Sequence, residues 1–230
     1  MRILAVDTSS NVATAAIMDG DKLVCEFVLN NKMTHSQTIM PIIDECFKKS
    51  ELTPGDIDLF AVAEGPGSFT GLRIGVTTVK GLAHAVNKPV VGVNTLEAMA
   101  YNLPFCPYII CPIMDARRAQ VYNAIYKFEN DELTTVKEPR AISLDELLCE
   151  IEEMGVQVVF LGDGVPVHKE SIKEKLKDKA MFAPGNVGMQ RASGVCLAAA
   201  GKEAVHYSRL APVYLRKSQA ERELEERGNK

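Results

Sequence analysis

The stretch AEGPGSFTGLRIGVTTVKGLA, residues 63–83, joins an apolar segment to a glycine-rich loop and then to a helical pattern. The apolar residues before the loop predict a short strand, and the loop at 65–67 consists of the turn-forming residues Gly-Pro-Gly. Hydrophobic spacing predicts a helix over 70–86. Three glycines fall inside that helix, at positions 71, 75 and 81, although each costs roughly 1 kcal/mol of helix stability relative to alanine.

The interior glycines lie mainly on one face of the predicted helix. Helical spacing produces an apolar stripe, which we expect to face the sheet of the same lobe. The stripe consists of Leu72, Val76, Val79, Ala83 and Val86. A face without side chains lets another backbone approach closely, and two interpretations are equally open. The face packs a second helix of the same chain, such as the one predicted at 35–49, or both helices present an intermolecular surface. On the second interpretation the partner-binding residues are His35, Ile39, Gly71, Ile74, Gly75, Thr78 and Leu82.

The glycine loop also has two interpretations. Glycines before a helix can offer backbone N–H groups to a phosphate or another anion. The sequence GPGSFTG lacks the Lys-Ser/Thr ending of a phosphate-binding P-loop, however. A tight turn between strand and helix is therefore the preferred interpretation.

The segment 1–103 is predicted to form one lobe. Its first strand ends at Asp7, a polar turn leads to a returning strand, and Asp19-Gly20 is a strong hairpin signal before a third strand. The helix that follows has a capping-box pattern at Thr34 and Gln37, and Pro41 predicts a kink or a later start. Alternating helices and strands complete this half.

The pattern restarts after residue 103. A strand ends at Asp115, a polar turn and a returning strand follow, and Ser143 with Glu146 predicts a capped helix that ends at Gly155. Antiparallel hairpins at both starts favour an α/β fold of the actin-like (ASKHA) type, with two duplicated ribonuclease-H-like lobes, over a single doubly wound sheet. We expect a diverged second lobe at 104–216, including a strand near 180–184 and a helix near 188–205, and a charged tail at 217–230.

Composition limits the possible functions. The chain has 230 residues and a formal net charge of −4, which argues against wrapping nucleic acid by bulk charge. No apolar run is long enough to predict a transmembrane helix, and the N-terminus does not have the form of a signal peptide, so a cytoplasmic location and no membrane partner are expected. The six cysteines form no CxxC pair and are expected to be buried thiols.

Four segments carry a resemblance to a known family: ILAVDTSS, HSQTIMPII, AVAEGPGSFTGLRIGVTTVKGLA and KPVVGVNTLEAMA. In this order they resemble the bacterial TsaB (YeaZ, glycoprotease-like) family of tRNA threonylcarbamoyladenosine biosynthesis proteins, most clearly over residues 1–100. The resemblance implies the two-lobed fold and pairing with the catalytic homologue TsaD and the ATPase TsaE. It implies that the wider complex uses ATP and a metal, that tRNA is reached only through the complex, and that the chain alone is a homodimer.

Catalytic relatives carry a stretch of the form GVHHMEGH in which two histidines hold a metal. The resemblance places Thr95 and Met99 at those positions, and neither replaces an imidazole ligand. The turn after Asp7 carries Ser9 where actin-fold kinases have glycine. We therefore expect no catalytic residue, metal or cofactor on this chain alone, and we favour a non-catalytic partner subunit over an ATP-binding enzyme acting alone or a glycopeptidase-like hydrolase. A basic turn at Arg117 and Arg118 could meet a partner, a phosphate or RNA, although solvated charge is the more common outcome.

Overall fold

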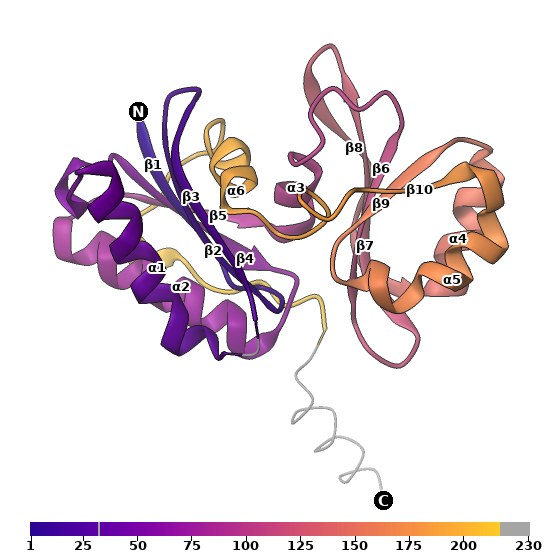
Figure 1. Cartoon of the computed structure of the whole chain (residues 1–230), viewed down its shortest axis with the longest axis horizontal. Helices are drawn as coiled ribbons and strands as arrows, with labels where there is room; N and C mark the ends of the chain where they lie inside the picture. The colour runs from indigo at the N-terminus through magenta and orange to yellow at the C-terminus, as the bar shows by residue number, and fades with distance from the viewer. Residues whose placement is uncertain (32, 217–230) are drawn as a thin grey trace, which may run out of the picture.

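The computed structural model describes residues 1–31 and 33–216, which form two lobes (Figure 1). The predicted tail at 217–230 lies outside the described residues. The first sheet has the strand order β3-β2-β1-β4-β5 and the second has the matching order β8-β7-β6-β9-β10. Two copies of one topology confirm the duplicated, actin-like fold. The first-sheet strands are β1 (Arg2–Asp7), β2 (Val12–Asp19), β3 (Lys22–Asn30), β4 (Leu59–Gly65) and β5 (Val90–Asn94), and the second-sheet strands are β6 (Ile109–Asp115), β7 (Gln120–Glu129), β8 (Glu132–Ser143), β9 (Val158–Leu161) and β10 (Ala180–Phe182).

Alternation along β1 explains how the first lobe is layered. Leu4 and Val6 point to one face and pack with α1 (His35–Ser50) and α2 (Phe69–Val86), which cover the outer side of the sheet (Figure 1). Ile3 and Ala5 point to the opposite face and belong to a separate apolar cluster. In the second lobe α4 (Leu144–Met154) and α5 (Gly164–Leu176) cover the outer face in the same way.

The inner faces of the two sheets are covered by an exchange of helices across the expected boundary at residue 103. Helix α3 (Thr95–Ala100) packs Leu96 and Met99 against the second sheet. Helix α6 (Ala192–Ala199), shorter than expected, packs on Ile3 and Ala5 of the first sheet, and both helices lie between the sheets in Figure 1. Helix α6 therefore packs with the first lobe, because it covers the apolar inner face of the first sheet.

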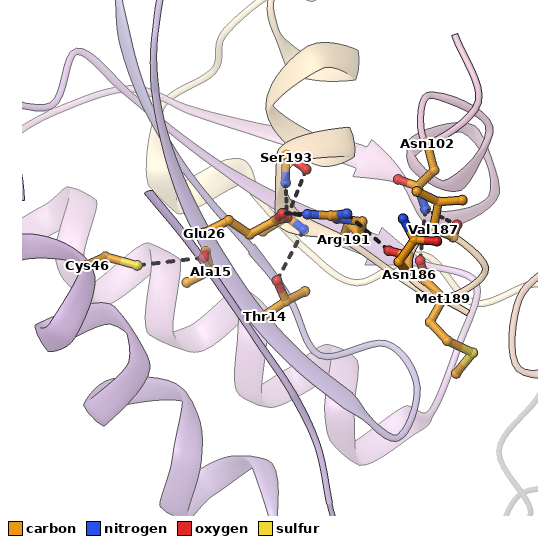
Figure 2. Close-up of polar contacts among 11 residues, drawn as sticks. Thr14, Ala15, Glu26, Cys46, Asn102, Asn186, Val187, Met189, Arg191 and Ser193 are labelled. Carbon is orange, nitrogen blue, oxygen red and sulfur yellow. Dashed lines mark hydrogen bonds and ion pairs between the residues drawn. The ribbon is translucent and has the colours of Figure 1, made fainter. Parts of the chain in front are cut away.

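A buried carboxylate anchors the N-terminus of α6. Glu26 on β3 has a side chain that is only 4% exposed, and it pairs with Arg191 (Figure 2). Its Oε1 atom accepts hydrogen bonds from the backbone N–H of Ser193 at 2.9 Å and from the hydroxyl of Ser193 at 2.8 Å. The amide of Ala192 donates to Oγ1 of Thr14 at 3.3 Å. These first-lobe groups satisfy helix N–H groups that otherwise lack partners.

The two helix caps predicted from the sequence had different outcomes in the structure. Ser143 caps α4 as predicted, since its hydroxyl accepts from the amide of Glu146 at 3.1 Å. At α1 the predicted box is wrong, because the hydroxyl of Thr34 donates to Oε1 of Gln37, and the amide of Gln37 donates to the carbonyl of Thr34 and not to its hydroxyl. The helix nevertheless starts at His35 and continues through Pro41.

The cysteines are all free thiols, but they are not all buried. Cys46, Cys111 and Cys196 are buried, whereas Cys149 is exposed on α4, which corrects the expectation of uniformly buried thiols. Across residues 1–31 and 33–216, none of the helices combines the length and the apolar character that a membrane span requires.

Candidate partner-binding groove and interlobe cleft

A groove runs between α1 and α2 on the outer side of the first lobe, with a volume of about 540 Å³. Ile39 and Met40 of α1 face Ile74 of α2 across it, and Met40 is 47% exposed. The structure thus brings together three of the predicted partner-binding residues, Ile39, Ile74 and Thr78. The complete lining is Ser36, Ile39, Met40, Phe69, Thr70, Arg73, Ile74, Thr77 and Thr78.

The end of the groove is built by a stack of aromatic rings. Phe69, at the start of α2, lies parallel to Tyr214 with ring centroids 3.8 Å apart. The guanidinium of Arg73 lies over the Phe69 ring, and its Nε donates to the hydroxyl of Tyr214 at 3.0 Å. The C-terminal segment near Tyr214 therefore holds one wall of the groove in place.

Two of the predicted glycine contacts do not face the groove. A Cβ atom on Gly71 would overlap the carbonyl oxygen of Thr8, and one on Gly75 would lie 2.5 Å from Oγ1 of Thr8. The Thr8 hydroxyl also donates to the carbonyl of Gly71 at 2.8 Å. The expectation that Gly71 and Gly75 present a bare surface is wrong, because the turn after β1 already covers them. Their neighbour inside the chain is mainly this turn and not the helix α1.

The remaining predicted positions are dispersed. His35 is half-buried with Nε2 2.6 Å from the carbonyl oxygen of Ser10, so it supports the turn after β1 and does not line the groove. Leu82 is partly buried against the core of the first lobe. Gly81 is exposed, and a Cβ atom there would meet no atom within 4 Å. A partner-binding role for any of these residues stays a prediction.

A second concavity, a cleft of about 460 Å³, lies between the lobes where the two β-hairpin turns face each other. The sequence places Asp7 and Asp115 in equivalent turns of the two halves but does not predict Asp163 or a joint site, although the repeated strand-Asp-turn pattern was the available signal. The lining combines the turn after β1, the start of α2, the turn after β6 and the C-terminal segment. Its residues are Ser9, Ser10, Asn11, Gly67, Ser68, Phe69, Thr70, Met114, Asp115, Ala116, Arg117, Tyr122, Asp163 and Arg216.

The first-lobe side of the cleft is a tight, self-contained turn. Asp7 is 1% exposed, its Oδ1 accepts from the amide of Ser9 at 2.8 Å, and burial raises its pKa to about 6. The amide of Ser68 donates to the carbonyl of Ser9 at 2.7 Å, and a Cβ atom on Gly67 would lie 2.8 Å from Cβ of Ser9. The glycine loop thus packs closely against the turn after β1, a contact that the sequence did not predict.

The second-lobe side contains two aspartates, Asp115 and Asp163, together with Arg117. Burial, followed by the charges of Asp115 and Asp7, raises the pKa of Asp163 to about 7. Oδ1 of Asp163 is buried and has no hydrogen-bond partner among the residues that the structure describes. Nε2 of His168 lies 4.0 Å from Oδ1 of Asp115, and Nη1 of Arg216 donates to the carbonyl of Ala116 at 2.8 Å. With a pKa of about 7, the carboxyl group of Asp163 can hold a proton near neutral pH.

The positions that correspond to metal ligands in catalytic relatives lie in packed surroundings. Thr95 is 0% exposed and Met99 is 1% exposed, and Met99 belongs to the core between α3 and the second sheet. Within the described part of the chain, no group of three or more His, Cys, Asp or Glu side chains is arranged to hold a metal ion.

Comparisons with known proteins identify the family and support the fold. A family model described as TsaD, tRNA N6-adenosine threonylcarbamoyltransferase, matches residues 22–224. The chain is 35% identical to the tRNA threonylcarbamoyladenosine biosynthesis protein TsaB of Bacillus subtilis over 96% of both chains, and 30% identical to the TsaB of Escherichia coli over 97% of this chain and 98% of the other. The solved structure of YeaZ from Pseudomonas aeruginosa, 22% identical, matches 93% of this chain and 99% of its own with a TM-score of 0.75, which shows the same fold. The chain therefore belongs to the TsaB family of tRNA threonylcarbamoyladenosine biosynthesis proteins.

Proposed function

We propose that this chain is a non-catalytic subunit that pairs with a TsaD homologue through the groove between α1 and α2. The observation that carries the proposal is the groove itself, whose lining includes the exposed Met40, the half-buried Ile74 and Ile39, which is 1% exposed. Apolar side chains that converge in an exposed groove are typical of protein–protein interaction sites. A TsaD homologue is a suitable partner because the matching family model is that of TsaD, so its lobes have related surfaces.

Further parts of the proposal follow from the family resemblance. The ATPase TsaE joins the same assembly, and ATP and the metal are used by the wider complex, not by this chain alone. The chain meets tRNA only through the complex and is found where tRNA is modified, in the cytoplasm. Without TsaD the same groove pairs two copies of the chain, since related subunits can use one surface for self-association and for a partner.

The test is to measure affinity for the TsaD homologue by calorimetry after Ile74→Glu, which puts a charge in the groove. Affinity should fall by roughly thirtyfold or more, the size of an interface hot spot. Val167→Glu is the matched control, because Val167 is 60% exposed on α5 in the other lobe and should leave affinity unchanged. Unchanged binding of the folded Ile74→Glu variant would exclude the groove as the docking surface.

A second candidate, an ATP-binding enzyme acting alone, draws support from the polar interlobe cleft, which Asp115 and Asp163 line and whose Asp163 is influenced by the charge of the buried Asp7. We expect negligible ATP hydrolysis by the isolated chain, because Ser9 fills the turn that a phosphate would approach. Metal-dependent turnover by the pure chain, lost in Asp7→Asn, would favour the second candidate.

A further inference from the structure

Two cysteines meet where the edge strand β3 packs against α1. The thiol of Cys25 on β3 donates to the backbone carbonyl of Cys46 on α1 at 3.6 Å. The thiol of Cys46 points to the adjacent strand and donates to the carbonyl of Ala15 at 3.6 Å (Figure 2). The Cys25 side chain is also among the groups that raise the pKa of the Cys46 thiol, so the two side chains are neighbours although they are 21 residues apart in sequence.

The two thiols differ in their surroundings. Cys46 is 0% exposed, and burial, followed by the neighbouring Cys25, raises its pKa well above the usual thiol range. Cys25 is only partly buried, and β3 is the last strand of its sheet, so a small reagent can reach it. A buried, protonated thiol is inert by itself, whereas a reachable thiol beside a second thiol is the arrangement of a peroxide-sensitive pair.

We propose that Cys25 and Cys46 form a peroxide-responsive pair that closes into a disulfide. Sulfur of Cys25 attacks hydrogen peroxide, the O–O bond breaks, and a sulfenic acid and one water form. Sulfur of Cys46 then attacks sulfur of Cys25, the S–O bond breaks, and the leaving hydroxide takes the thiol proton of Cys46 as a second water. Two thiols are oxidised by two electrons in total, and one peroxide is reduced to two waters.

The proposed disulfide links the edge strand β3 covalently to α1, the helix that forms one wall of the groove. Ile39 and Met40 line the groove one to two turns before Cys46 on the same helix. A disulfide there restrains the unfolded chain, so the oxidised protein should melt at a higher temperature than the reduced one.

The experiment exposes the folded full-length protein to hydrogen peroxide and maps its cysteines by mass spectrometry without reduction. It uses a Cys149→Ser background, because Cys149 is exposed and could join two molecules. We expect one cross-linked peptide pair containing Cys25 and Cys46, lighter by two hydrogen atoms, with a higher melting temperature. Dithiothreitol should reverse both changes.

Two matched variants separate the roles of the thiols. In Cys46→Ala the sulfenic acid has no thiol to resolve it, so Cys25 should proceed to sulfinic acid. In Cys25→Ser, which leaves the core intact, Cys46 should stay reduced at the same peroxide dose. The proposal is overturned if Cys25 of the unsubstituted pair becomes sulfinic acid while Cys46 stays a thiol, or if Cys25 bridges only to a second molecule.

Discussion

At Gly71 and Gly75 the absence of a side chain decides how closely α2 approaches the turn after β1. Both glycines are buried, and Thr8 lies where their Cβ atoms would be. This close approach brings the turn and the N-terminus of α2 together at the interlobe cleft, so the helix accepts residues of low helix propensity for a structural reason. Gly81, at the exposed end of the same helix, has no such neighbour.

Gly71→Ala should therefore destabilise the protein by roughly 1–3 kcal/mol, because the new methyl group overlaps the Thr8 carbonyl. Gly81→Ala, the matched control, should stabilise it by about 0.5–1 kcal/mol through helix propensity alone. Urea unfolding of both variants measures the difference. Equal, stabilising effects at both positions would contradict the contact with Thr8.

Asp163 should make stability depend on pH. Its folded pKa, about 7, lies above its unfolded value of 3.8, so the folded state binds the proton more tightly. The contribution of Asp163 to the free energy of unfolding is therefore fully present below about pH 4, and it is lost as the pH rises through about 7. Asp163→Asn removes the buried charge and should raise the melting temperature at pH 8 much more than at pH 5. Asp178→Asn, an exposed control, should change neither value, and a pH-independent effect of Asp163→Asn would contradict the assignment.

At the scale of elements, the anchoring of α6 depends on one carboxylate. Glu26→Gln leaves Arg191 without its ionic partner, and removal of one member of a buried pair should cost about 3 kcal/mol in the free energy of unfolding. Glu152→Gln is the control, because the side chain of Glu152 is 51% exposed and its contact with Lys175 lies at the surface. That change should cost less than about 1 kcal/mol. Equal costs in chemical denaturation would show that the anchor is not specific to Glu26.

Elements with local signals could be predicted from the sequence, and long-range contacts could not. The Asp19-Gly20 hairpin and the Ser143 cap depend on neighbouring residues, and both appear in the structure. The partner of Gly71 lies 63 residues away, and the cover for Ile3 and Ala5 comes from the other end of the chain. Helical periodicity identifies a face of small residues, but it does not say which backbone will occupy that face. Of the seven residues proposed for partner binding, Ile39, Ile74 and Thr78 line the groove, and their role in binding stays a prediction.

At the scale of the whole molecule, the exchange of α3 and α6 makes the lobes interdependent. Residues 1–103 produced alone should fail to fold cooperatively, because Ala192 and Val195 no longer cover the inner face of the first sheet. Circular dichroism melting and binding of a hydrophobic dye measure this outcome. Production together with residues 104–216 should restore a folded complex. A cooperative, dye-free monomer of 1–103 would contradict the dependence.

The exchange also sets an order of events during synthesis on the ribosome. Strand β5 ends at Asn94 and α6 ends at Ala199, so about 100 residues are added after the first sheet is complete and before its inner face is covered. At roughly 5–20 residues per second the nascent chain carries that apolar face for about 5–20 seconds. Helix α3, by contrast, is made before the sheet that it covers. The two lobes share one topology but are completed at different times, because the first sheet is not covered until the second lobe has been synthesised. During that interval the apolar inner face of the first sheet is exposed to a chaperone.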